Sequence, residues 1–245
     1  MMLNDQWIFI SPHLDDVALS CGGLVWRLAK EGQQVSIWTL LAGDPPDEDY
    51  SEFARANHQR WGISGGEAIA MRRKEDQAAC DRLGAAFRHF DLLDAIYRRD
   101  SRTGEAVVNN NDELFGKQPE PEMVSLMTEL LSREAPAEAQ LVLPLGLGGH
   151  IDHRLAATAS ESFQRTAAFY LDFPYILNNF ETPILKSGEL QKIPAQLSEE
   201  ALTAWQDAVL CYVSQVGDFW TDEAETRLAL RNYLAGGGGR LWIRI

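Results

Sequence analysis

The sequence of 245 residues predicts an α/β fold with a mostly parallel sheet, and three observations support this prediction. Continuous apolar runs at residues 7–10 (WIFI) and 35–41 (VSIWTLL) are typical of strands that are buried on both faces. Between these runs, residues 17–30 carry apolar side chains at helical spacing, and Gly32 follows as a stop signal. A strand, a helix and a second strand in this order form a βαβ unit, so the two strands should be parallel.

The same alternation of elements continues along the rest of the chain. Further helices are expected at residues 67–83, 122–133 and 198–214, and after His153 through about residue 165. An apolar patch covers residues 87–93, and further strands are expected at 141–143, 168–171 and 240–245. Residues 44–49 and 100–120 are polar and should form loops, but neither is long enough to mark a domain boundary. The prediction is therefore one Rossmann-like domain, residues 1–245, with helices on both faces of the sheet.

Composition and charge exclude several classes of function. With 22 Lys and Arg against 36 Asp and Glu, the formal net charge is −14, which argues against binding to nucleic acid or to an anionic membrane surface. The three cysteines are far apart and form no CxxC motif, which fits a reducing compartment. Because neither a signal peptide nor an apolar run of roughly 18 residues is visible, we expect a cytoplasmic protein without membrane insertion.

Two polar clusters follow two of the predicted strands. His13, Asp15 and Asp16 come directly after the first strand, and residues 146–154 (GLGGHIDHR) come after the strand at 141–143. Asp15 and Asp16 could merely stabilise a helix N-terminus, and the histidines of the second cluster could be surface loop residues. However, the carboxyl ends of parallel strands meet at one edge of a sheet, where ligands bind. Two such clusters at matching strand ends therefore favour one shared site.

The residue types and their spacing point to a catalytic metal. His13 and Asp16 are three positions apart and can face one point, while His153 can supply a third ligand from the other strand end. Two imidazoles and a carboxylate leave a zinc ion one open position, as in catalytic sites, although Fe²⁺ or Mn²⁺ would also accept these ligands. A water molecule in that position becomes acidic near neutral pH, and a carboxylate outside the ligand set must take its proton. Asp15 suits this role.

These motifs resemble the PIG-L/LmbE family of zinc-dependent N-deacetylases. The resemblance rests on residues 12–16 (PHLDD) with Gly22 and Gly23 behind them, and on residues 150–153 (HIDH). It also takes in residues 72–75 leading to Leu83 and Gly84, residues 170–175 (YLDFPY), and residues 212–215 (YVSQ). Leu14 and Ile151 stand where many family members have proline, and residues 100–120 have no counterpart that we can place.

The resemblance implies a role for each matching residue. His13, Asp16 and His153 would be zinc ligands, Asp15 the general base, and His150 the group that assists the oxyanion or the leaving amine. Asp152 would orient and tune His150. Arg72 matches a position that contacts substrate in relatives, but an ion pair between Arg72 and Glu75 at helix spacing is an equally good structural interpretation.

The expected activity is that of a metal-dependent amidohydrolase. It would hydrolyse the linear amide of an N-acetylated amino sugar, such as an N-acetylglucosaminyl conjugate, with zinc-bound water as the nucleophile. The alternative is a non-catalytic binding or regulatory protein on the same fold, which is disfavoured because every candidate catalytic position holds a competent residue. A nucleotide-binding dehydrogenase would need a glycine fingerprint where this chain has His-Leu-Asp-Asp. The expected partner is a small acetylated sugar, and the resemblance also implies that a homo-oligomer can form.

Overall fold

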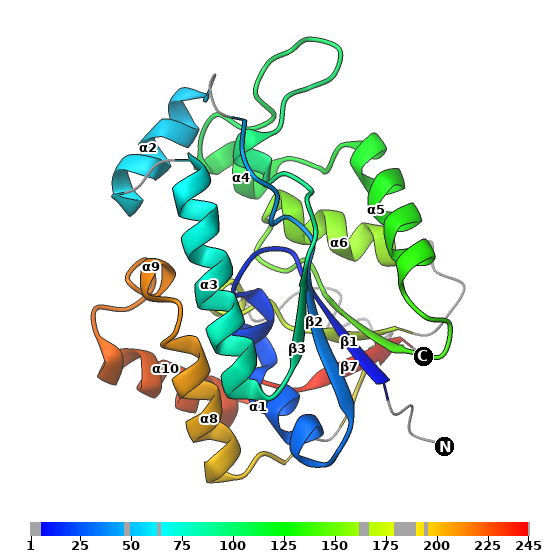
Figure 1. The fold of residues 1–245 in the computed structure, drawn as a ribbon, viewed down its shortest axis with the longest axis vertical. Helices are drawn as coiled ribbons and strands as arrows, with labels where there is room; N and C mark the ends of the chain where they lie inside the picture. The colour runs from blue at the N-terminus through cyan, green and yellow to red at the C-terminus, as the bar shows by residue number, and fades with distance from the viewer. Residues whose placement is uncertain are drawn as a thin grey trace.

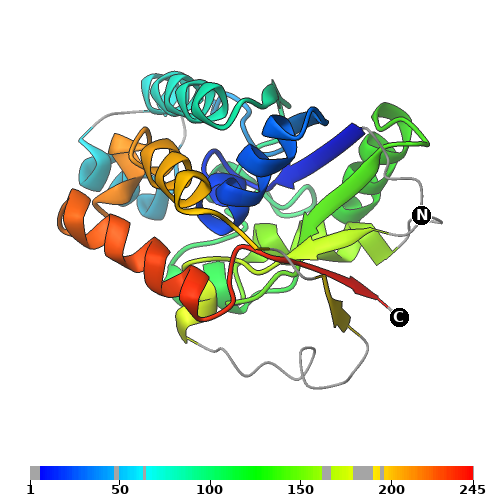
Figure 2. The ribbon, with the colours of Figure 1, turned by 90° about the horizontal axis from the view of Figure 1, so that it is seen from below.

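The computed structural model describes residues 6–46, 50–62, 65–161, 167–178, 190–193 and 196–244. Within these residues, seven strands form one sheet in the order β3-β2-β1-β4-β5-β7-β6 (Figures 1 and 2). The strands are β1 (Gln6–Ser11), β2 (Gln34–Thr39), β3 (Ala86–His89), β4 (Gln140–Pro144), β5 (Ala168–Tyr170), β6 (Leu190–Lys192) and β7 (Leu241–Arg244).

The pairing of the strands confirms the predicted, mostly parallel sheet. Strand β1 lies between β2 and β4 and is parallel to both, β3 is parallel to β2, and β5 is parallel to β4. Only the β5–β7 and β7–β6 pairs are antiparallel. The chain builds β2 and β3 on one side of β1 and then crosses to β4 on the other side. This reversal opens a crevice at the carboxyl ends of β1 and β4, the usual ligand position in such sheets.

Helices cover both faces of the sheet, as expected (Figure 1). The helices are α1 (Asp16–Lys30), α2 (Glu52–Trp61), α3 (Gly65–Leu83), α4 (Asn111–Gly116), α5 (Pro121–Glu134), α6 (Ile151–Glu161), α8 (Glu199–Val209), α9 (Val213–Val216) and α10 (Glu223–Ala235), with 3₁₀ turns η1 (Ala95–Tyr97) and η2 (Tyr175–Asn178). Helices α1, α3 and α8 pack together on one face, and α5 and α6 pack together on the other.

The apolar run of β1 explains why both faces are covered. Phe9 packs into the cluster formed with α1 and α3, which includes Val17 and Leu83. Its neighbour Ile8 points to the opposite face and packs with Met127 of α5. Since successive strand residues alternate between faces, a continuous apolar run needs an apolar layer on each side.

Close packing of α1 against α8 explains the pair of glycines in α1. A Cβ atom at Gly22 would lie 2.6 Å from Cδ1 of Trp205, so only glycine leaves room for this indole. Trp205 is fully buried, and its Nε1 donates a hydrogen bond to the carbonyl oxygen of Ala18 at 2.5 Å. The position of α8 over the start of α1 therefore depends on these small residues.

Several expectations about single elements were wrong. Helices α2 and α10 and strand β6 were not expected, and α4 lies inside the segment 100–120 that was expected to be a loop. The expected helix at 198–214 is two helices, because α8 ends at Val209 and Tyr212 has a non-helical φ of −86° and ψ of 61°. Tyr212 instead donates a hydrogen bond to Asp76 of α3 at 2.7 Å, a long-range contact that local spacing cannot reveal.

Other boundaries agree to within a few residues. Helix α6 ends at Glu161, and the rest of the helix expected to about 165 lies outside the described residues, as do residues 47–49 of the expected loop and residue 245 of the last strand. No helix of the described chain combines the length and apolar character that crossing a membrane requires.

Candidate metal and catalytic site

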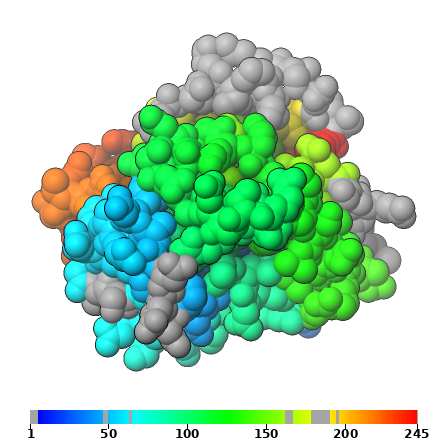
Figure 3. Space-filling model, turned by 90° about the horizontal axis from the view of Figure 1, so that it is seen from above, coloured from blue at the N-terminus to red at the C-terminus, as the bar shows by residue number. Residues whose placement is uncertain are grey.

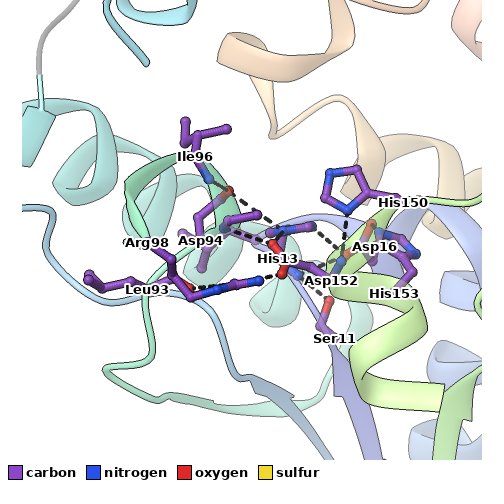
Figure 4. A network of polar contacts seen from close by, with 12 residues as sticks. Ser11, His13, Asp16, Leu93, Asp94, Ile96, Arg98, His150, Asp152 and His153 are labelled. Atoms are coloured by element: carbon purple, nitrogen blue, oxygen red, sulfur yellow. Dashed lines mark hydrogen bonds and ion pairs between the residues drawn. The ribbon is translucent and has the colours of Figure 1, made fainter. Parts of the chain in front are cut away.

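The two polar clusters come together at the carboxyl edge of the sheet (Figure 4). His13 follows β1, whereas His150 and His153 lie at the start of α6, which follows β4. The ring centroid of His13 is 4.9 Å from that of His150 and 5.5 Å from that of His153. The prediction that both strand ends contribute to one site is therefore confirmed.

Asp16 lies between two of these histidines. Its Oδ2 accepts a hydrogen bond from the backbone N–H of His13 at 2.7 Å and is 3.4 Å from Nδ1 of the same residue. Its Oδ1 is 3.2 Å from Nε2 of His153. The carboxylate thus faces one nitrogen of each imidazole.

The other nitrogen of each of these imidazoles meets a buried carboxylate. Nε2 of His13 is 3.0 Å from Oδ2 of Asp152, and Nδ1 of His153 is 2.7 Å from Oδ1 of Asp172, which follows β5. Metal-binding histidines in proteins usually have such a carboxylate behind them, because it fixes the tautomer and orientation of the ring. The sequence analysis did not assign Asp172 to the site.

The donor set fits a divalent cation. Nε2 of His153 is buried and has no hydrogen-bond partner in the described part of the chain, although it directly faces Asp16. Burial alone would lower the pKa of His153, but the carboxylates of Asp16 and Asp172 raise it to about 10. Positive charge on His153 therefore stabilises the carboxylates of Asp16 and Asp172, and a metal ion can supply this charge in place of the imidazole proton.

Two other combinations of ligand atoms lie within 4.8 Å of one another, and one of them joins His13 to Asp94 and Asp152. One ring nitrogen each of His13, His150 and His153 lie within 4.8 Å of one another. His150 could thus replace Asp16 as the third ligand. The hydrogen bonding of His150 favours Asp16 as the third ligand. Nδ1 of His150 accepts the backbone N–H of Asp152 at 3.2 Å, so the proton of the neutral ring lies on Nε2 and this nitrogen has no free lone pair for a metal.

His150 is placed to act as a neutral hydrogen-bond donor. Burial, and then the neighbouring His13 and His153, lower the pKa of His150 well below its usual value. A neutral imidazole carries one proton, and because Nδ1 accepts a hydrogen bond from Asp152 N–H, this proton belongs on Nε2. The ring lines the cavity described below.

Asp15 has an unusual backbone conformation. It occupies the N-cap position of α1 with a φ of 153°, and it is the only non-glycine residue with a positive φ in the described chain. Its side chain makes no capping hydrogen bond, so capping of the helix does not explain this backbone conformation. Strained conformations of this kind concentrate at functional sites. Burial, reinforced by the charge of Asp16, raises the pKa of Asp15 to about 7.

The carboxylate of Asp152 makes its hydrogen bonds to groups other than His150. Its Oδ2 contacts His13 and accepts the backbone N–H of Ala95 at 2.9 Å, and its Oδ1 accepts a hydrogen bond from Arg98 at 2.7 Å. The backbone N–H of Asp152 donates to Nδ1 of His150, and the charge of its carboxylate acts against the burial that lowers the pKa of that imidazole. The hydrogen bonds of the carboxylate have a geometric reason: Asp152 lies in the first turn of α6, and its side chain points toward the loop that carries Arg98.

Arg72 lies at the site and not in the helix-surface pair with Glu75. Its Nη2 is 3.9 Å from Oδ2 of Asp15 and 3.4 Å from the carbonyl oxygen of Leu14. Glu75 instead accepts hydrogen bonds from the backbone N–H and the hydroxyl of Ser214 at the start of α9. The structure therefore places Arg72 beside Asp15, and its contact with substrate stays a prediction.

A cavity of about 340 Å³ opens over these residues. Its floor includes His13, Asp15 and His150, and its walls come from α2, α4, η2 and the segment after α9. The walls carry aromatic and amide side chains, namely Asn57, Trp61, Asn111, Phe115, Tyr175 and Phe219. Helix α2 and the segment around α4 lie side by side on the face that Figure 3 shows. The segment 100–120, which the sequence analysis could not place, therefore forms part of the cavity wall.

Comparisons with known proteins agree with this geometry. A 2'-N-acetylparomamine deacetylase of Niallia circulans is 30% identical over 241 residues, which cover 91% of this chain and 85% of that protein. A teicoplanin deacetylase in a zinc-inhibited form has a similar structure, with a TM-score of 0.74 and 27% identity over 97% of each chain. A deacetylase of the pseudoaglycone of the antimicrobial reagent A40926 has a TM-score of 0.70 and 28% identity, over 99% of this chain and 97% of that one.

Residues 8–163, which include both histidine motifs, match the family described as PIG-L, GlcNAc-PI de-N-acetylase. This match covers more than half of the chain and begins in β1, the strand that leads into the site. The sequence, the fold and the arrangement of the two motifs thus lead to the same assignment, and the chain belongs to the PIG-L family of de-N-acetylases.

Proposed function

We propose that this chain is a zinc-dependent N-deacetylase that hydrolyses the acetamide of an N-acetylated amino sugar. The observation that carries the proposal is the buried Nε2 of His153, which faces Asp16 and lies beside His13, while His13 itself lines a cavity together with Asp15 and His150. His13, Asp16 and His153 would hold the metal, with Asp152 and Asp172 behind the two imidazoles. When bound, zinc supplies a Lewis acid that polarises a carbonyl and acidifies water.

Asp15 is the general base of the proposed reaction. Its pKa of about 7 lets the carboxylate accept a proton from the attacking water near neutral pH. The side chain is held by its strained backbone and by the nearby guanidinium of Arg72, so it does not need to reorient before the reaction. Because Asp15 is adjacent in sequence to Asp16 but points elsewhere, one carboxylate can hold the metal while the other moves the proton.

His150 stabilises the oxygen of the acetyl group as negative charge develops on it. A neutral imidazole with its proton on Nε2 is a donor that can point into the cavity, whereas a protonated ring would be costly at this depth. The proton that Asp15 has taken from the attacking water can then pass to the leaving amine. Both roles require that the acetamide lie between His150 and Asp15.

The cavity suits a sugar ring better than a long apolar chain. A volume of about 340 Å³ holds one acetylated ring and part of its neighbour. Trp61, Phe115 and Phe219 offer flat apolar surfaces, and Asn57 and Asn111 offer amides for hydroxyl groups. The names of the relatives support an amino-sugar conjugate, since they include deacetylases of 2'-N-acetylparomamine and of teicoplanin.

The test combines metal content with acetate release. Purified protein should contain about one divalent ion per chain, and zinc-loaded protein should release acetate from 2'-N-acetylparomamine or an N-acetylglucosamine conjugate. Reconstitution with Fe²⁺ or Mn²⁺ compares the other ions that these ligands accept. His153→Ala should lose both metal and acetate release, whereas Val213→Ala, an exposed change on α9, serves as the matched control. Wild-type protein that binds substrate and metal without releasing acetate would instead support a binding role.

A further inference from the structure

We propose that Arg98 is a positioning residue for the metal site: it fixes the carboxylate of Asp152, and Asp152 in turn orients His13. This inference rests on the proposed metal site and adds a residue to it that does not touch metal or substrate. Arg98 directly follows η1 and does not belong to either of the two polar clusters that follow predicted strands. Its role follows from its contacts (Figure 4).

The guanidinium of Arg98 donates hydrogen bonds to three separate segments of the chain. Nη1 donates to Oδ1 of Asp152 at 2.7 Å and to the carbonyl oxygen of Leu93 at 3.0 Å. Nε and Nη2 donate to the two carboxylate oxygens of Glu120 at 2.8 and 3.1 Å, a bidentate pair. Such paired hydrogen bonds fix a guanidinium in one orientation, which lysine cannot reproduce.

The contact with Asp152 involves a fully buried charge. Asp152 has no exposed surface, and Arg98 is only 5% exposed. Arg98 Nη1 holds one oxygen of this carboxylate at 2.7 Å, and the other oxygen lies 3.0 Å from His13 Nε2. Without Arg98, the carboxylate would lose the cation at Oδ1 and move toward another partner, because an unpaired buried charge is very costly.

A displaced Asp152 would no longer lie within hydrogen-bond distance of His13 Nε2, where the next carboxylate, Asp94, is 3.6 Å away. Asp152 Oδ2 lies 3.0 Å from Nε2 of His13 and thereby directs Nδ1 toward Asp16. Ala95 N–H helps to hold the same oxygen, and the guanidinium of Arg98 offsets the charge of the carboxylate from its other oxygen. Loss of a carboxylate behind a metal-binding histidine typically weakens metal affinity about 10- to 100-fold. We expect an effect of this size when Arg98 is removed.

The same contacts connect the site to the segment 100–120. Glu120 lies at the N-cap of α5, after the residues that form one wall of the cavity. The chain of contacts from Glu120 through Arg98 and Asp152 to His13 therefore joins the start of α5, five residues after Phe115 of the cavity wall, to the proposed metal ligand.

The experiment measures zinc affinity of the metal-free protein by competition with a chromophoric chelator, together with thermal unfolding without metal. The variants are Arg98→Met, which removes the charge, Arg98→Lys, which restores it, and Glu120→Gln, which weakens the bidentate pair. Arg227→Met is the control, since Arg227 makes an ion pair with Asp207 at the same 2.7 Å distance, in a more exposed position on the α8–α10 side of the molecule. Arg98→Met should bind zinc about 10- to 100-fold more weakly, and Arg98→Lys should recover part of that loss.

A purely structural ion pair would give a different result. In that case Arg98→Met would unfold at a lower temperature, as Arg227→Met should, but the folded protein would bind zinc as tightly as wild type, and the proposal would be overturned. If Arg98→Met does not fold, Arg98→Lys and Glu120→Gln decide: weaker zinc binding in both supports the proposal, and wild-type affinity in both refutes it. Failure of the wild-type protein itself to bind zinc would refute the proposed function instead.

Discussion

The substitution Asp15→Asn isolates the proposed proton transfer from metal binding. Asparagine has nearly the same shape and is among the residues that best tolerate a positive φ, so the strained backbone at 153° should be kept. The proposed metal ligands remain intact, so metal content should not change. The amide cannot accept the proton that a carboxylate with a pKa of about 7 accepts. Since general base catalysis is worth about 10² to 10⁴ in rate, the activation barrier should rise by about 2.7–5.4 kcal/mol.

The neighbouring substitution Asp16→Asn should fail in the opposite way. It removes the charge that faces Nε2 of His153 at 3.2 Å and replaces one carboxylate oxygen by an N–H donor. A neutral amide oxygen is a poorer ligand for zinc than a carboxylate. Metal content should therefore fall, and turnover should fall with it.

The assay pairs elemental analysis with kcat for acetate release at saturating substrate. The reasoning is refuted if Asp15→Asn turns over within a few-fold of wild type while it retains its metal. If Asp15→Asn loses metal and Asp16→Asn keeps it, the two assignments are reversed. Circular dichroism of both variants shows whether the fold is retained.

The other predictions concern the carboxylate behind His153, the cavity wall and the core. Asp172→Asn should weaken zinc affinity about 10- to 100-fold in a chelator competition, and unchanged affinity would contradict the role of its 2.7 Å contact with His153. Phe115→Ala should raise KM roughly 5- to 30-fold, equivalent to about 1–2 kcal/mol of lost binding, with little change in kcat; an unchanged KM would place the substrate elsewhere. Trp205→Ala should reduce the free energy of unfolding by about 3–5 kcal/mol in urea titrations, because the buried indole leaves a void beside α1; a loss below about 1 kcal/mol would show that the core collapses around it.

The sequence alone determined the central part of the fold. The apolar runs of β1, β2 and β4 and the helical spacing of α1, α3 and α5 are local patterns, and the structure places all of them as expected. Local patterns are sufficient here because a parallel strand with helices on both faces must be apolar along its whole length. Helix α2 escaped prediction because it buries only Ala54 and His58 and therefore has little apolar periodicity.

The sequence also determined which residues meet at the site, through the rule that parallel strands share a carboxyl edge. His13, Asp16 and His153 lie together for this reason. The same rule could have identified Asp172, which comes two residues after the end of β5. Only the tertiary structure assigned partners to these groups: it placed Asp152 behind His13 and Arg72 beside Asp15.

The tertiary structure alone also revealed Arg98 and the cavity wall around Phe115. Both lie in connections whose course is set by long-range contacts, such as the pair between Arg98 and Glu120. An arginine in a polar stretch looks like any solvated surface residue, because its burial depends on segments distant in sequence that fold over it. Strand ends are fixed by local apolar patterns, whereas the partners of a buried charge are chosen by whichever segments meet there, and that choice leaves no periodic signal in the sequence.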